Sequence, residues 1–101
     1  MSITVLRREQ SWLARLEGPV TIASAVELKA LLVEWLATGK NLELDLENAD
    51  EIDITCMQLL TAAARDAGAA GAGIVVRLSA AATAAVHDAG FDQMPAFKVQ
   101  E

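Results

Sequence analysis

The chain has 101 residues, 53% of them apolar, and a formal net charge of −6. This length suits one small domain, residues 1–101, and the acidic charge argues against a nucleic-acid partner because phosphates would repel it. The single cysteine, Cys56, excludes an intramolecular disulfide, and together with the single histidine, His87, it supplies too few ligands for a structural zinc site.

No apolar run approaches the roughly 20 residues that a transmembrane helix needs, and residues 1–8 lack the apolar core of a signal peptide. We therefore expect a cytoplasmic protein with no membrane insertion.

Alternating apolar residues predict two antiparallel strands near the N-terminus, over residues 3–7 and 10–16, joined by a turn at 8–10. Gly18 and Pro19 predict the end of the second strand, because both residues interrupt regular structure.

A helix follows. Ser24 with Glu27 three residues later forms a capping box, so the helix begins at about residue 24 or a residue or two earlier. Its apolar residues fall at helical spacing and give a broad apolar face: Val26, Leu28, Ala30, Leu31, Leu32, Val33, Trp35 and Leu36. Gly39 suits the left-handed position that ends a helix.

Residues 41–46 predict a strand with one buried face, because three leucines alternate with Glu43 and Asp45. Residues 47–52, which include Glu47, Asp50 and Glu51, are predicted to be an acidic connection between this strand and the next helix. Thr55, followed by Gln58 and an apolar run, is a second capping box and predicts a helix over about 55–69 with the Thr55 hydroxyl at its N-cap.

Residues 74–78 are rich in β-branched side chains and are the best candidate for a central strand. Ser79 predicts the N-cap of a third helix over 80–88 that Gly90 ends, and residues 96–99 suggest a last edge strand. The order β-β-α-β-α-β-α predicts an α/β fold with a single mixed four- to five-stranded sheet and helices packed on one side.

Three segments resemble one protein family, the STAS domain, which includes anti-sigma-factor antagonists and related bacterial adaptors. Residues 18–32 (GPVTIASAVELKALL) are similar to the family pattern G-x-L-T-x-x-x-A-x-x-L-x-x-x-L. Residues 44–53 (LDLENADEID) are similar to L-D-L-S-x-V-x-x-I-D, and residues 55–60 (TCMQLL) to Ser/Thr-Gly-Leu-x-x-Leu.

The resemblance implies that Thr55 stands where phosphorylatable family members carry their regulatory Ser or Thr, two residues after the aspartate, here Asp53. Two neighbours differ from the family. Ile54 replaces a residue that is often Ser or Thr and adds bulk beside the site, and Cys56 replaces a glycine, placing a side chain where a kinase loop would approach.

From the residue type alone, Thr55 and Asp53 are helix-capping residues; the resemblance adds a phosphoacceptor role for Thr55 and partner contacts for Asp53, Ile54, Thr55, Cys56 and Gln58. Cys56 is either a thiol activated by the helix N-terminus or an inert buried cysteine. The acidic run Glu47, Asp50, Glu51 and Asp53 lacks the spacing of a calcium loop, so we expect a solvated loop and no metal.

The resemblance implies a non-enzymatic protein–protein interaction module that acts in the manner of an anti-sigma-factor antagonist: it docks a kinase-type anti-sigma factor and regulates transcription through a Thr55 switch. The alternative is an unphosphorylated adaptor in a lipid-transport ABC complex, beside its ATPase or permease, or in a chemotaxis or two-component signalling cluster beside a signalling kinase. We expect a monomer or weak dimer without a cofactor. The chain shows no set of nucleophile, base and oxyanion-stabilising residues that would indicate an enzyme, and no phosphate-binding loop for a nucleotide.

Overall fold

A computed structural model describes residues 1–91 of the chain. Its elements, in chain order, are β1 (Ser2–Arg7), β2 (Ser11–Val20), the 3-10 turn η1 (Ile22–Ser24), α1 (Ala25–Leu36), β3 (Asn41–Leu46), β4 (Ala49–Ile52), α2 (Ile54–Ala69), β5 (Ile74–Leu78) and α3 (Ala80–Asp88). The predicted hairpin, the three predicted helices and the strands at 41–46 and 74–78 are all confirmed.

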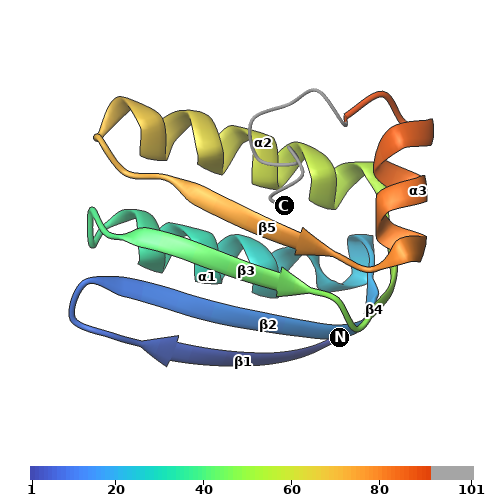
Figure 1. The fold of residues 1–101 in the computed structure, drawn as a ribbon, viewed down its shortest axis with the longest axis horizontal. Helices are drawn as coiled ribbons and strands as arrows, with labels where there is room; N and C mark the ends of the chain where they lie inside the picture. Colours follow the sequence, from blue (N-terminus) through green and yellow to red (C-terminus); the bar gives the residue numbers. More distant parts are fainter. Residues whose placement is uncertain (92–101) are drawn as a thin grey trace.

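The strands form one mixed sheet in the order β1-β2-β3-β5, with β4 paired to β2 (Figure 1). β1 runs antiparallel to β2, whereas β2 with β3, β3 with β5 and β2 with β4 are parallel pairs. The predicted α/β fold with a single mixed sheet is therefore confirmed. Within residues 1–91 β5 pairs only with β3, so it lies at the edge of the sheet that these residues form. The prediction of a central strand is wrong for the described sheet. The strand suggested at 96–99 lies outside the described residues.

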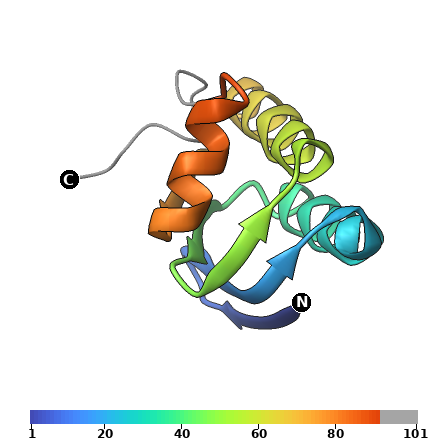
Figure 2. The same cartoon turned by 90° about the vertical axis from the view of Figure 1, so that its right-hand side faces the viewer.

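The helices cover the sheet in two ways. α1 and α2 lie side by side over one face, as Figure 2 shows, and α3 crosses the end of the sheet, where it packs mainly against β4. The core lies between the sheet and the first two helices. It contains Leu42, Leu44 and Leu46 of β3, as the alternation predicted, together with the fully buried Trp35 and Leu60.

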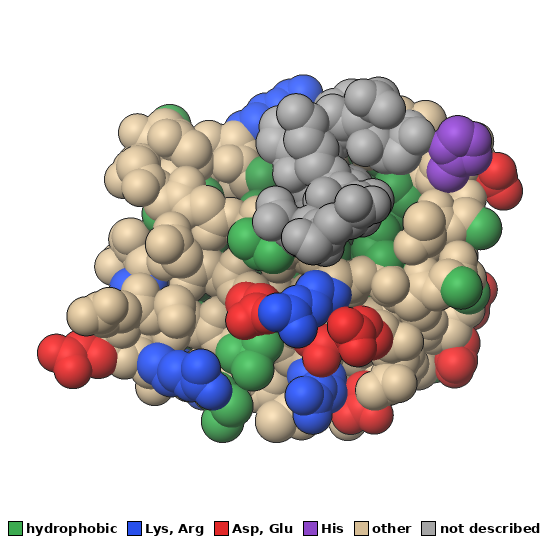
Figure 3. Space-filling view, in the orientation of Figure 1, with side chains coloured by type: hydrophobic (Ala, Val, Ile, Leu, Met, Phe, Trp, Pro, Cys, Tyr) green, Lys and Arg blue, Asp and Glu red, His purple; other side chains and the backbone are tan. Residues whose placement is uncertain are grey.

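The other face of the sheet carries ion pairs. Arg15 bonds Asp45 at 3.2 Å, and Arg77 bonds Glu43 at 2.6 Å, each across neighbouring strands. Figure 3 views the molecule from this side and shows acidic and basic side chains intermingled on it. Such pairs are expected on a solvated sheet face, where each contributes under about 1 kcal/mol.

β2 is longer than the sequence predicted. Gly18 and Pro19 lie inside it, at a register shift where β2 leaves β3 and pairs with β4. Gly18 donates its N–H to the carbonyl of Asn48 beside β4 and takes a positive φ of 80°. Pro19 is tolerated because it lies past the end of β1, which pairs with β2 only as far as Glu17. Reading these two residues as the end of the strand was therefore wrong.

β4 is the element that the sequence did not indicate. Residues 47–52 were expected to be an acidic connection, but Ala49 and Ile52 are buried on the inside of a short strand, with Asp50 and Glu51 exposed between them. The chain turns away at Glu47 and returns to the same edge of β2. This brings the carboxyl ends of β2 and β4 together immediately before α1 and α2.

α1 buries less of its apolar surface than the broad apolar face suggested. Leu28, Leu31, Leu32 and Trp35 are buried, but Val26, Ala30 and Val33 are exposed. The helix packs through a single stripe, so apolar residues on the far side reach solvent. None of the helices in residues 1–91 has the length and hydropathy to span a membrane.

Candidate functional site

α2 begins one residue earlier than predicted, with Asp53 as its N-cap instead of Thr55. The Asp53 carboxylate accepts a hydrogen bond from the backbone N–H of Cys56 at 3.0 Å, and the backbone of Asp53 is extended. The Thr55–Gln58 capping box is therefore wrong: Thr55 is the second residue of the helix, and Gln58 is exposed on its surface. Both Asp and Thr are good caps, and the turn after β4 decides which one occupies the position.

Asp53 also joins two distant segments. Its second carboxylate oxygen accepts a hydrogen bond from the backbone N–H of Ile22, at the start of η1. Its own N–H donates to the carbonyl of Val20 at 3.1 Å. One side chain thus satisfies backbone donors at the beginnings of both η1 and α2, and this fixes Ile22 beside the start of α2.

Thr55 is partly exposed, and its hydroxyl makes no hydrogen bond to any residue in the described part of the chain. It lies in the first turn of α2, where backbone N–H groups lack helical partners and the helix dipole is positive. A phosphate or another acceptor at this point would meet favourable dipoles. The position therefore suits either a docking contact or a phosphoacceptor.

Cys56 is the inert cysteine of the two alternatives. Its side chain is fully buried, and its Sγ lies 3.5 Å from the carbonyl oxygen of Thr21. Burial, together with the nearby Asp53 carboxylate, raises the pKa of the thiol from 9.0 to about 12. The expectation that Cys56 places bulk in the path of a kinase loop is wrong, because the side chain points into the protein.

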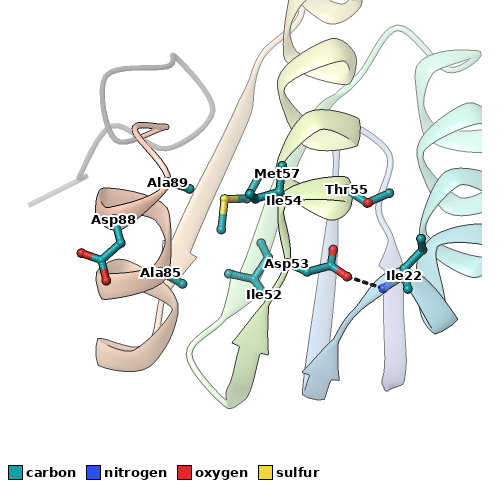
Figure 4. Close-up of a pocket in the computed structure, with 9 residues that line it drawn as sticks. All are labelled: Ile22, Ile52, Asp53, Ile54, Thr55, Met57, Ala85, Asp88 and Ala89. Carbon is teal, nitrogen blue, oxygen red and sulfur yellow. Dashed lines mark hydrogen bonds between the residues drawn. The ribbon is translucent and has the colours of Figure 1, made fainter.

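The site is an open groove of about 580 Å³ between the start of α2 and α3 (Figure 4). Its lining is mainly apolar: Ile22, Ile52, Asp53, Ile54, Thr55, Met57, Ala85, Asp88 and Ala89. In Figure 4 Thr55 lies toward Ile22, and Met57 lies toward Ala89. Asp53 and Asp88 are the only charged residues in this lining, and both are acidic.

Two isoleucines flank Thr55 on the outside of the protein. Ile54 is 53% exposed and Ile22 is 69% exposed. The sequence pointed to Ile54, but not to Ile22, Met57 or Asp88. Ile22 could have been predicted, because segments that follow the carboxyl ends of neighbouring parallel strands meet at one edge of the sheet. The sequence analysis did not predict β4, so it did not place Ile22 and the start of α2 at the same edge.

The acidic residues do not gather into a metal site. Within residues 1–91 no cluster of three histidine, cysteine or acidic side chains is arranged to hold an ion. Glu47, Asp50 and Glu51 are exposed, and Asp45 is engaged by Arg15 and by the backbone of Glu47. His87 is exposed on α3.

Comparison with protein families decides the relationship. A family model described as "Mlab, STAS domain" matches residues 3–99. The chain belongs to the STAS domain family. This confirms the resemblance found in the three sequence segments, and STAS membership supports a protein-interaction role. A search of curated proteins found no match.

Solved structures described as anti-sigma factor antagonists share the fold. A protein described as an anti-sigma factor antagonist from Thermotoga maritima is 11% identical, with a TM-score of 0.78 over 91% of this chain and 81% of the other. An anti-sigma factor antagonist from Mycobacterium paratuberculosis is 20% identical, with a TM-score of 0.75 over 91% and 80%. SpoIIAA in its unphosphorylated form is 13% identical, with a TM-score of 0.66 over 74% and 71%.

The chain also matches part of a larger protein, Mglu, at 20% identity with a TM-score of 0.67. The match covers 78% of this chain and 20% of Mglu, so the chain spans about a fifth of that protein's length. Because all four structures are at most 20% identical to this chain, the comparisons show a shared fold.

Proposed function

We propose that the chain is a protein-docking module whose partner binds a docking surface made of Ile22, Ile54, Thr55 and Gln58. The observation that carries this proposal is that two isoleucines, each more than half exposed, flank a threonine hydroxyl without a hydrogen-bond partner among the described residues. Apolar side chains held in water at such a position favour burial by a partner, at about 25 cal/mol per Å².

Asp53 and Cys56 support the docking surface from beneath. Both carboxylate oxygens of Asp53 accept backbone hydrogen bonds, and the Cys56 side chain is buried. Asp53 therefore holds Ile22 and Ile54 side by side, and Cys56 fills the space under the first turn of α2. Neither residue needs to touch the partner directly.

The first candidate partner is a kinase-type anti-sigma factor, and phosphorylation of Thr55 would release it. A phosphate adds about two negative charges between the two isoleucines and beside the acidic Asp53 and Asp88. Charge buried without a counterpart opposes association, so the phosphorylated form would leave its partner free.

The second candidate is an adaptor role in a lipid-transport ABC complex, with the transporter's ATPase as the partner. Two observations favour it: the matching family model is of the Mlab type, and Ile54 stands where many STAS proteins carry a hydroxyl. In that case Thr55 is a docking residue that is never modified, and the exposed Ile54 enlarges the apolar contact.

A binding experiment tests the docking surface. Wild-type chain and the variants Thr55→Glu, Thr55→Ser and Thr4→Glu are titrated by calorimetry against the kinase-type anti-sigma factor and against the transporter ATPase from the same organism. Thr4 is exposed on β1, away from the groove, and controls for added charge. We expect Thr55→Glu to weaken binding by at least about tenfold, with Thr55→Ser and Thr4→Glu close to wild type. A Thr55→Glu chain that binds as tightly as wild type would refute the docking surface.

Phosphate analysis separates the two candidates. The chain is incubated with the anti-sigma kinase and ATP, and intact mass is measured, with Thr55→Ala as the control. Phosphate on wild type but not on Thr55→Ala supports the antagonist role. An unmodified chain that binds the ATPase supports the adaptor role.

A further inference from the structure

The exposed apolar side chains of the described residues are unevenly distributed. Six large ones are exposed, and four of them lie on η1, α1 and the start of α2: Ile22 (69% exposed), Val26 (80%), Val33 (58%) and Ile54 (53%). Leu6 and Val75 are the other two, on β1 and β5. We call the group of four the apolar band.

The apolar band is continuous with the docking surface. Ile22 and Ile54 line the same groove, and the Asp53 carboxylate ties the backbone of Ile22 to the start of α2. Ile22 lies in η1, directly before α1, and Val33 follows Val26 by seven residues, so Val26 and Val33 share one face of α1. At 1.5 Å per residue, Val26 and Val33 are about 10 Å apart along α1.

The shape of the band fits the side of another helix. Ala30 is exposed between Val26 and Val33, one helical turn from each, so we expect its small side chain to leave a depression between two larger ones. Helices pack when a side chain of one enters such a depression in the other. A strand or a flat surface would leave the depression empty.

The charges around the band indicate the partner's composition. Asp88 lines the groove end, and the exposed Glu27 adjoins Val26, whereas Glu34 is already bonded by Arg7 at 3.1 Å. Lys29 is the basic neighbour on the other side of the helix face. With a net charge of −6 on the chain, an anionic membrane is disfavoured. A second copy is disfavoured too, because pairing two bands would set Glu27 and Asp88 of one acidic chain against the same acidic residues of the other.

We propose that the apolar band receives an amphipathic helix of the partner protein, with a large apolar side chain seated over Ala30 and Lys or Arg at the end nearest Asp88. This rests on the proposed function, because the helix belongs to the partner that covers Ile54 and Thr55. It extends that partner's contact from the start of α2 along the length of α1.

Substitutions on α1 test the band with the same two probe proteins, the anti-sigma kinase and the transporter ATPase. Val26→Lys, Val26→Glu, Val33→Lys and Ala30→Leu all place good helix formers at exposed positions, so α1 stays folded. Ala62→Lys, at an exposed position of α2, is the matched control. Circular dichroism confirms the fold of each variant before calorimetry.

We expect Val26→Lys and Val33→Lys to lower affinity by at least about tenfold, and Ala30→Leu to lower it by filling the depression, with Ala62→Lys unchanged. Val26→Glu should bind more tightly than Val26→Lys, because a basic helix repels lysine and attracts glutamate. Equal losses for the two would refute the basic composition.

If Val26→Lys and Val33→Lys bind with wild-type affinity while Thr55→Glu binds more weakly, the apolar band is refuted as a binding surface and the docking surface is supported. Weaker binding by Val26→Lys and Val33→Lys beside wild-type affinity in Thr55→Glu would show that a partner covers α1 without covering Thr55, and would overturn the proposal that its helix extends the docking surface. Binding to neither probe protein overturns the partner helix. Self-association of the chain in sedimentation would also overturn the partner helix if Val26→Lys abolishes that self-association. Binding of the chain to phosphatidylserine vesicles would overturn it in the same way if Val26→Lys abolishes that binding.

Discussion

Asp53 is the residue on which the geometry of the docking surface depends. Its two carboxylate oxygens serve different segments, so substitutions separate its two bonds. Removing both hydrogen bonds should lower the free energy of unfolding by about 2–4 kcal/mol, because a helix cap and a charged hydrogen bond are lost. An asparagine retains an oxygen for Cys56 but turns its amide N–H₂ toward the N–H of Ile22, where two donors oppose each other.

The first prediction concerns this residue. Asp53→Ala lowers the free energy of unfolding by about 2–4 kcal/mol, and Asp53→Asn lowers it by about 1–2 kcal/mol, both measured by urea denaturation. In Asp53→Asn the amide resonance of Ile22 shifts most in an NMR spectrum. Glu51→Gln, at an exposed position of β4, is the control and stays near wild type. An unmoved Ile22 resonance in Asp53→Asn would contradict the bridging role.

The second prediction concerns Cys56 and pH. Its pKa is raised from 9.0 to about 12 in the folded chain, so between these values the unfolded thiol loses its proton while the folded thiol keeps it. The unfolded state then binds fewer protons, and stability falls as pH rises above about 9. Wild type should lose stability relative to Cys56→Ala over this interval, at up to about 1.4 kcal/mol per pH unit.

The measurement is urea denaturation of wild type and Cys56→Ala at pH 7, 9 and 10.5. Near pH 7 Cys56→Ala is the less stable chain, because a buried sulfur is removed, and the gap narrows as the pH rises. Alkylation by iodoacetamide at pH 8 gives a second readout: the native thiol resists it and the urea-unfolded thiol reacts. A constant gap across the pH series would count against the raised pKa.

At the scale of elements, most of the fold could be predicted because the signals were local. Leu42, Leu44 and Leu46 alternate along β3, Ser79 caps α3, and Gly39 and Gly90 take the positive φ values that end their helices. These patterns depend on a few adjacent residues. For each of these elements the local sequence favoured one structure, so the prediction did not depend on tertiary contacts.

Elements defined by tertiary contacts were missed. β4 has only four residues, and its burial runs inward at Ala49 and Ile52 with acids between them, which does not alternate. Its pairing with β2 across the Gly18–Pro19 register shift is a long-range property. The cap of α2 was misplaced for the same reason, since Asp53 and Thr55 are both good caps and β4 decides between them.

The third prediction concerns the junction of β4 and α3. The Ser79 hydroxyl accepts from the N–H of Ala82 at 3.0 Å and donates to the carbonyl of Ala49 at 2.8 Å. Ser79→Ala loses both bonds and should lower stability by about 1–2 kcal/mol in urea denaturation. Ser79→Asp keeps the cap but sets a carboxylate against the Ala49 carbonyl, which isolates the second bond.

Thr83→Ala is the control for this pair. Its hydroxyl donates within α3 to the carbonyl of Ser79, four residues back, and such bonds add little to helix stability. We expect a change within about 0.5 kcal/mol. A Ser79→Ala chain as stable as Thr83→Ala would show that the junction does not hold α3 in place.

At the scale of the whole molecule, the two faces of the sheet have separate roles. One face is buried under α1 and α2, and the other is solvated and held by the Arg15–Asp45 and Arg77–Glu43 pairs. The proposed contacts lie on neither face. They lie at the carboxyl ends of β2 and β4 and on the outer side of α1, so a partner can dock without disturbing the core.

The position of β2 has a consequence for how the chain is made. β2 pairs with β1 immediately, but its partners β3 and β4 follow about 30 residues later, as Arg15 and Asp45 illustrate. At a translation rate of about 5–20 residues per second, one edge of β2 stays unpaired for roughly 2–6 seconds. During that interval the nascent strand can pair with another chain, and the exposed charges of Arg15 and Glu17 are the feature of β2 that opposes such aggregation.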